Sequence, residues 1–257
     1  MKTTIRHTNL YSVSWAMLYV SVKELMTSRI LTRLAITFVA TMGLLYVVSW
    51  RGNAAAFWFV VTGPFFAWFL PVMCLTKGGE SVRSELKEGT MEYLWTRPVR
   101  RGNLFIGLYA ASLASVIATV GSVTIGVVAV GILIGAWGSL MTLLGFVACV
   151  IVCVFGYTAI SALLGAYSAR FVVLGVLYFS MIESGIGKIP TGIHNVAISA
   201  HVRDVLVPLR YGESTLVWGD FFVGAAWILA IGCVALAAGA ALFANTQYFV
   251  GSTTESE

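Results

Sequence analysis

The residues able to take part in ionic chemistry are few in this sequence, and more than a third of them lie in one stretch. Segment 77–103 holds 10 of the chain's 27 charged side chains, four acidic and six basic. A solvated loop on the inner side of a membrane explains the basic residues but not the interleaved acids, nor the apolar side chains beside them. Mixed charge with apolar side chains left over is typical of a surface that contacts another protein.

The sequence offers no set of residues for catalysis or for holding a metal. It contains no GxSxG motif and no HExxH motif. His194 and His201 have only Asp204 as a nearby acid, so we predict surface histidines and no metal site. Segment 185–188, Gly-Ile-Gly-Lys, lacks the first glycine and the Ser or Thr that a P-loop needs. We therefore expect no enzyme activity and no cofactor in this chain.

One further acid, Glu183, falls within a long apolar run. Ionisable groups inside a membrane segment usually face a cavity or a partner group, which makes Glu183 a candidate for a transport pathway. Alternatively, the apolar segment ends a turn early, and Glu183 is exposed to water or pairs with Lys188. The sequence leaves both interpretations open.

The surroundings of these residues are too apolar for a water-soluble protein. The 257-residue chain is 59% hydrophobic and 11% charged, with a mean hydropathy of +0.90. Its apolar runs are long and do not alternate, which selects helices over a β-barrel. The prediction is an all-α integral membrane protein with six transmembrane helices. The predicted spans are 32–50, 55–76, 104–136, 140–166, 171–188 and 219–244.

Two features of these spans allow structural predictions. Pro64 and Pro71 should kink the second span, because each removes a backbone donor. The third span is too long for a simple crossing, so it should tilt or protrude into water. Pairs of small residues four apart predict close helix packing within the chain. They are Gly131 with Gly135, Ser161 with Gly165, and Ala235 with Gly239. The aromatic residues of the second span, which could line an apolar route, are interpreted mainly as lipid-facing or core residues.

The distribution of positive charge predicts the orientation of the spans. If the N-terminus is inside, 12 of the 16 Lys and Arg residues lie on the inner side, which places both termini in the cytoplasm. Residues 15–29 mix apolar and charged positions at helical spacing and predict an amphipathic interface helix, the alternative being the frayed start of the first span. Segment 184–218 then becomes the long outer loop.

The stretch 88–104, Glu-Gly-Thr-Met-Glu-Tyr-Leu-Trp-Thr-Arg-Pro-Val-Arg-Arg-Gly-Asn-Leu, resembles the signature between the second and third spans of ABC-2 type permeases, the NosY-like proteins among them. In that family an acidic residue, Gly-Thr, a short apolar helix and a Pro-Val turn recur together. The resemblance implies one ABC-2 transmembrane domain over residues 1–257 with a type V exporter-like fold. Leu108 departs from the pattern, because the family often has a lysine there.

By that resemblance, segment 77–103 is a cytoplasmic coupling loop that contacts a separate ATP-hydrolysing subunit, and 184–218 forms short re-entrant helices on the outer face. The implied partners are two copies of an ABC ATPase, which bind ATP and Mg, and a second permease chain, identical or homologous. No nucleic acid is expected, and the implied location is a prokaryotic inner membrane. The residues implied in ATPase coupling are Glu80, Glu85, Glu88, Thr90, Met91, Glu92, Tyr93, Leu94 and Arg97.

The function implied is that of a permease subunit of an ATP-driven exporter. The main rival is an ATP-independent secondary transporter or channel, which predicts coupling charges buried in the middle of the membrane. A non-transporting membrane anchor subunit is the other alternative. The cargo stays open: a peptide, a lipid-like molecule, a drug, or a component for maturation of an extracytoplasmic metalloenzyme, as in a NosY-like role.

Overall fold

The computed structural model describes residues 36, 39–41, 43, 47, 54–87, 101–183, 185, 196–210 and 218–245, without the side chains of 85–87 and 207–210. These residues form helices, with short turns at 135–139 and 168–170 and no strand among the described residues. In chain order the helices are α3 (Ala54–Val60), η1 (Val61–Phe69), α4 (Leu70–Lys87), α6 (Arg101–Ile134), α7 (Leu140–Tyr167), α8 (Phe171–Tyr178), η2 (Phe179–Glu183), α9 (Ile198–Arg210) and α10 (Trp218–Asn245).

Four helical runs are long and apolar enough to cross a membrane. They are Ala54–Ser84, Arg101–Ile134, Leu140–Tyr167 and Trp218–Asn245. The protein is therefore an all-α, multi-pass membrane protein. The predicted first span lies mostly outside the described residues, and the six described positions within it are helical. The predicted interface helix, 15–29, lies wholly outside them.

The second span departs from α-helical geometry at Pro64. η1, which contains this proline, is a π-helix, and the Leu70 amide that follows it donates to the carbonyl of Phe65, five residues back. A proline lacks the amide that an α-helix would use at its position, and a wider turn is one way for a helix to continue past it. Pro71 lies in the first turn of α4, beside this change of register.

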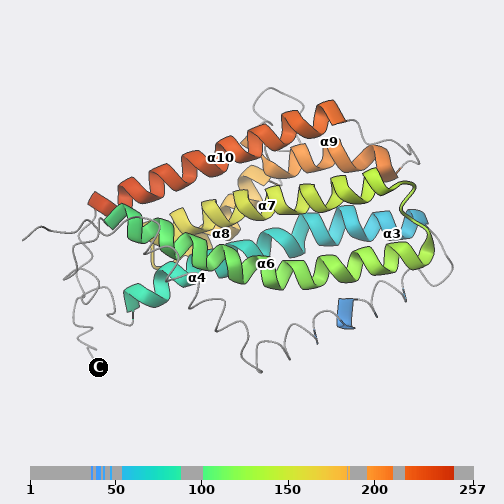
Figure 1. Ribbon diagram of the computed structural model, residues 1–257. Coiled ribbons are helices and arrows are strands. Elements are labelled where there is room, and N and C mark those ends of the chain that lie inside the picture. The colour runs from blue at the N-terminus through green and yellow to red at the C-terminus, as the bar shows by residue number, and fades with distance from the viewer. Residues whose placement is uncertain are drawn as a thin grey trace, which may run out of the picture.

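Helix α7 lies at the centre of the bundle, packed against α4 on one side and α10 on another (Figure 1). Small residues permit this contact. A Cβ on Gly78 would come within 2.8 Å of the Cβ of Ser161, whose hydroxyl donates to the Leu75 carbonyl at 2.5 Å. A Cβ on Gly239 of α10 would overlap the ring of Phe105. The small-residue pairs containing Ser161 and Gly239 are confirmed as packing positions within the chain.

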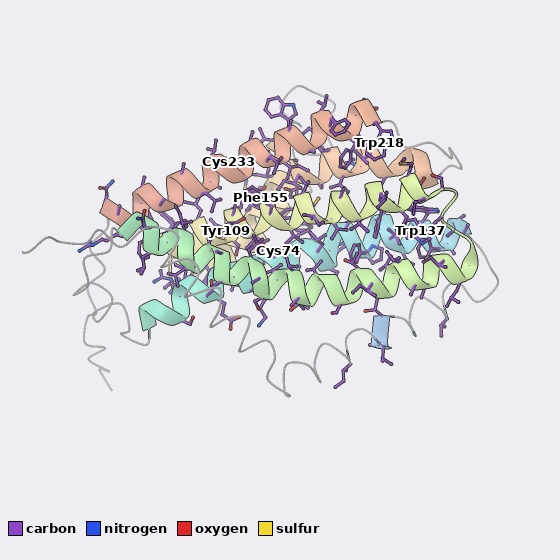
Figure 2. All side chains as sticks on the ribbon, in the orientation of Figure 1. Cys74, Tyr109, Trp137, Phe155, Trp218 and Cys233 are labelled. Atoms are coloured by element: carbon purple, nitrogen blue, oxygen red, sulfur yellow. The ribbon has the colours of Figure 1, made fainter. Side chains whose placement is uncertain are left out.

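An aromatic cluster closes the end of the bundle where α6 turns into α7. The ring of Trp137 lies 5.7 Å from Phe57, 5.3 Å from Trp58 and 5.0 Å from Phe146. Its indole N–H donates to the Val128 carbonyl at 3.1 Å, and Figure 2 shows it at this end of the molecule. Trp137 is partly buried and therefore packs against the core at this end of the bundle.

The predicted fifth span is shorter than expected. Helices α8 and η2 together run from Phe171 to Glu183, and Gly185 lies in a turn, so the helix ends five residues before the predicted boundary at 188. Thirteen residues extend for about 20 Å, less than the roughly 30 Å of a hydrocarbon layer. Five of the six exposed residues of this short helix are apolar, Val172, Val173, Val176, Leu177 and Met181, and the sixth is Ser180.

Candidate functional site

The predicted coupling segment begins and ends on helices rather than on a loop. Helix α4 continues to Lys87 and α6 begins at Arg101, so the predicted loop boundaries at 77 and 103 lie inside helices. Figure 1 shows these two helix ends at the same end of the bundle. The hydropathy pattern placed the span boundary at 76 because the residues beyond it are polar, although they continue the same helix.

The structure places only the start of the predicted coupling set. Glu80 lies on α4, exposed, and pairs with Lys77 at 3.3 Å. Glu85 is within α4, but its side chain is not described. The other predicted contacts lie outside the described residues: Glu88, Thr90, Met91, Glu92, Tyr93, Leu94 and Arg97. Leu108, the departure from the family pattern, is buried at 4% exposure in the core, where a lysine would be costly.

The charged end of α4 is tied to the start of α8. The Nε of Arg83 donates to the Ser168 carbonyl at 3.0 Å, in the turn between α7 and α8. Nearby, a Cβ on Gly79 would overlap the ring of Phe171, the first residue of α8. These contacts join α4 directly to the start of α8.

Glu183 lies at the far end of that short helix and is 3% exposed. The Tyr178 hydroxyl donates to Oε1 at 2.9 Å. The backbone amide of Ile198 donates to Oε1 at 3.2 Å, and that of Ser199 donates to Oε2 at 2.8 Å. The Ser199 hydroxyl donates to the Glu183 carbonyl at 3.2 Å. The interpretation that Glu183 is already exposed to water is therefore wrong.

This arrangement makes Glu183 the N-terminal cap of α9. The first amides of a helix have no partner within the helix and carry part of its positive macrodipole, so a carboxylate there is stabilised without a basic side chain. Sequence reasoning missed the two amides because any residue type provides them. Tyr178 precedes Glu183 by five residues, which is the spacing of a π-turn, and that spacing is the signal that could have identified it.

A second tyrosine completes the surroundings of Glu183. The hydroxyl of Tyr157, on α7, is buried, and Glu183 is among the groups that interact with it. Tyr157 itself is 1% exposed. No sequence signal connects it with Glu183, because they belong to different helices.

The histidine prediction requires correction. His201 is 6% exposed, on the inner face of α9, and its ring stacks on Trp227 at 6.4 Å with an interplanar angle of 7°. It is a core residue and not a surface histidine, because the amphipathic α9 turns Arg203 and Asp204 outward instead. His194 lies outside the described residues. Within the described part of the chain, no three His, Cys, Asp or Glu residues gather as metal ligands.

The aromatic residues of the second span separate into two groups. Phe57, Trp58, Phe65 and Phe66 are at most 5% exposed, whereas Phe59 and Trp68 are 56% and 64% exposed. Four of these six are therefore core residues, and Phe59 and Trp68 lie on the surface of the chain. Phe65 and Phe69 also line an apolar cavity of about 230 Å³, which lies between η1, α6 and residues 40–41.

Comparison with known proteins agrees with the arrangement of helices. The model of a family described as "ABC-2 family transporter protein" matches residues 6–186, more than half of the chain. The chain belongs to this ABC-2 transporter family. Members form the membrane component of transporters and normally work with an ABC ATPase. No curated protein matches the sequence significantly.

Proposed function

We propose that this chain is the permease subunit of an ATP-driven exporter in a prokaryotic inner membrane, with both termini in the cytoplasm. Two permease chains, identical or homologous, would assemble with two copies of an ABC ATPase, which binds ATP and Mg. The observation that carries the proposal is segment 77–103, an acidic and basic stretch between the second and third spans of a chain that belongs to the ABC-2 family.

The lengths of the flanking helices support this role for the segment. Helix α6 has 34 residues and extends for about 51 Å, well beyond the roughly 30 Å of hydrocarbon. The run Ala54–Ser84 has 31 residues. Helices of this length extend beyond the hydrocarbon, and the charged ends of both flank the proposed coupling loop. An exposed surface there suits contact with a cytoplasmic ATPase.

The contacts of α4 suggest how ATPase closure would reach the membrane. The loop would move the end of α4, Arg83 would carry that movement to the Ser168 turn, and α8 would follow. At the other end of this short helix, Glu183 holds the first residues of α9. Segment 184–218, which contains α9, would form the re-entrant cap of the exit. Glu183 thus connects the driven helix with the proposed gate.

Co-purification tests the proposal. The wild-type chain should bring down an ABC ATPase, and reversing the charges of Glu88 and Arg97 should abolish the complex because both would lose partners of opposite charge. Asp220→Lys is the matched control, since Asp220 is exposed in the first turn of α10, at the opposite end of the bundle. A native membrane extract without any associated ATPase would contradict the proposal.

Transport assays separate the proposal from its main rival. A buried carboxylate such as Glu183 would also suit a secondary transporter. If the chain is an ABC permease, transport into sealed vesicles should require ATP and should continue when ion gradients are collapsed. Glu183→Gln should lower that transport while the ATPase still co-purifies. Transport that follows an ion gradient and ignores ATP would favour the secondary transporter.

A further inference from the structure

The apolar cavity between η1, α6 and the helical residues 40–41 has a buried floor and an exposed rim. Figure 1 shows segment 39–41, in blue, beside α6. Ala40 and Pro64, which line the cavity, are exposed. The cavity is therefore a recess that opens onto the surface of the chain, and it is called the side recess below. Its floor consists of side chains that are at most 5% exposed, Val61, Phe65, Val123 and Val127.

The side recess lies within the apolar part of the bundle. Its lining residues on the second span, between 60 and 69, lie roughly 10–20 Å along the helix from Ala54, at about 1.5 Å per residue. One leaflet of hydrocarbon is about 15 Å deep, half of the full thickness. The charged residues Lys77, Arg83 and Arg101 lie towards the other end of these helices. The recess therefore faces acyl chains rather than headgroups or water.

The chemistry of the lining also favours hydrocarbon over water. Among the lining residues that the structure describes, Thr41 has the one polar side chain. A water molecule in a cavity needs two to four polar partners, and an apolar cavity of about 150 Å³ stays dry but takes up benzene. The side recess, at about 230 Å³, is larger than that. It suits an apolar guest longer than one aromatic ring.

The residue types around the side recess explain why the protein does not fill it. The second span departs from α-helical geometry at Pro64, and the residues of α6 and of the first span that face this point are short: Val123, Val127 and Ala40. A larger side chain at any of these three positions would enter the recess. Side chains that line an empty recess lose their dispersion contacts on that side, so a closely fitting guest is favoured.

We propose that the side recess binds one acyl chain of a bilayer phospholipid, which stays with the protein between its second and third spans. A helix of a second permease chain, about 10 Å across, is too wide to enter a cavity of this volume. A chain of methylene groups is narrow enough, and the bilayer supplies it at the depth of the recess. The site does not depend on an ATPase, so it goes beyond the proposed function.

Photolabelling with a lipid tests this site. The full-length protein is placed in nanodiscs with a phospholipid that has a diazirine midway along one acyl chain, and mass spectrometry maps the modified residues after irradiation. Val234, which is 69% exposed on α10, reports contact with bulk lipid. Phe57, a core residue at 0% exposure, reports background. We expect Phe65 and Val127 to be labelled as strongly as Val234, and Phe57 to stay unlabelled.

Variants that fill the side recess should remove this labelling. Val127→Phe should lower labelling of Phe65 about tenfold relative to Val234, because the added ring takes the space and the contacts of the acyl chain. Ala40→Phe should act in the same direction from the exposed rim, where a larger side chain does not threaten folding. Ile125→Phe is the matched control: Ile125 is on the same helix and 63% exposed, and labelling of Phe65 should not change.

Four results would overturn the proposal. The first is labelling of Val234 without Phe65 and Val127, and the second is Phe65 labelling that neither Val127→Phe nor Ala40→Phe lowers. The third is labelling that disappears in the assembled transporter, which would assign the recess to a partner chain. The fourth is labelling that falls severalfold when ATP is added to the complex, which would make the guest a cargo.

The outcomes for the side recess and for the proposed function are distinguishable. If Phe65 labelling behaves as expected but no ATPase associates with the chain, the lipid site stands and the proposed function fails. ATP-driven transport by a chain whose recess is never labelled refutes the lipid site alone.

Discussion

A Cβ atom on Gly165 of α7 would lie 2.9 Å from both the Cα and the carbonyl oxygen of Gly79 on α4, so the two helices meet backbone to backbone at this point. The same region holds the Arg83 bond to Ser168 and the contact of Gly79 with Phe171. Close contact here joins α4, α7 and the start of α8 near the proposed coupling surface.

Gly165→Ala should destabilise the protein by about 1–3 kcal/mol, because backbone atoms cannot move aside for the added methyl group as a flexible side chain could. Gly121→Ala is the control, since a Cβ at Gly121 in α6 meets nothing within 4 Å. That change should leave stability equal or slightly higher. Thermal unfolding in a fixed detergent compares the two, and equal midpoints would show that α4 and α7 are further apart than described.

Trp137→Ala should destabilise the protein by about 3 kcal/mol, the lower end of the range for removing a large aromatic side chain, because Trp137 is partly buried against the core. Trp137→Phe should cost less, because it keeps part of the ring packing and loses the indole bond to Val128. Trp68→Ala provides the contrast, as Trp68 is 64% exposed. Resistance to thermal aggregation in detergent ranks the three variants, and a larger loss for Trp68 than for Trp137 would contradict the described core.

Arg83→Gln should lower the amount of transport per ATP hydrolysed by roughly five- to tenfold. A change of this size corresponds to a typical coupling free energy between linked sites. The change removes the Nε donor to Ser168 that joins α4 to α8. ATPase co-purification should persist. Lys77→Gln, on the same helix but in an exposed pair with Glu80, should have little effect. Transport per ATP hydrolysed is the measurement, and a normal ratio in Arg83→Gln would exclude this route.

Brominated lipids should quench the fluorescence of Trp68 much more than that of Trp58 in variants that retain one tryptophan. Trp68 is 64% exposed on the second span and Trp58 is 4% exposed. Quenching requires contact with acyl chains, so it maps the faces that lipid covers. Failure to quench Trp68 in the assembled complex, with quenching in the isolated chain, would place the second permease chain on this face.

The apolar spans were predictable because hydrophobicity is a property of local composition. The predicted limits of the third, fourth and sixth spans lie within three residues of α6, α7 and α10. The limits failed where a helix continues beyond its apolar part, as in α4 beyond Thr76, and where a helix ends before the predicted boundary, at Glu183. Hydropathy indicates whether a residue is suited to lipid or to water, but it does not show where a helix begins or ends.

The predictions for His201 and Glu183 also failed or stayed open because local sequence does not show how a helix packs. His201 was assigned to the surface because it lacks the neighbours of a metal ligand, but the helical face it shares with Val202, Val205 and Leu206 is buried. The sequence could not decide between the alternatives for Glu183, because they differ only in whether the apolar segment ends one helical turn earlier.

The sequence by itself determined that this chain lies in a membrane and where its charged stretch falls, because both follow from residue types counted along the chain. Only the tertiary structure decided what Glu183 does. Its partners are two backbone amides, 15 and 16 residues later in the chain, and the hydroxyl of Tyr178. No residue type encodes a backbone amide as a ligand, so that relationship exists only once α9 is folded against the spans.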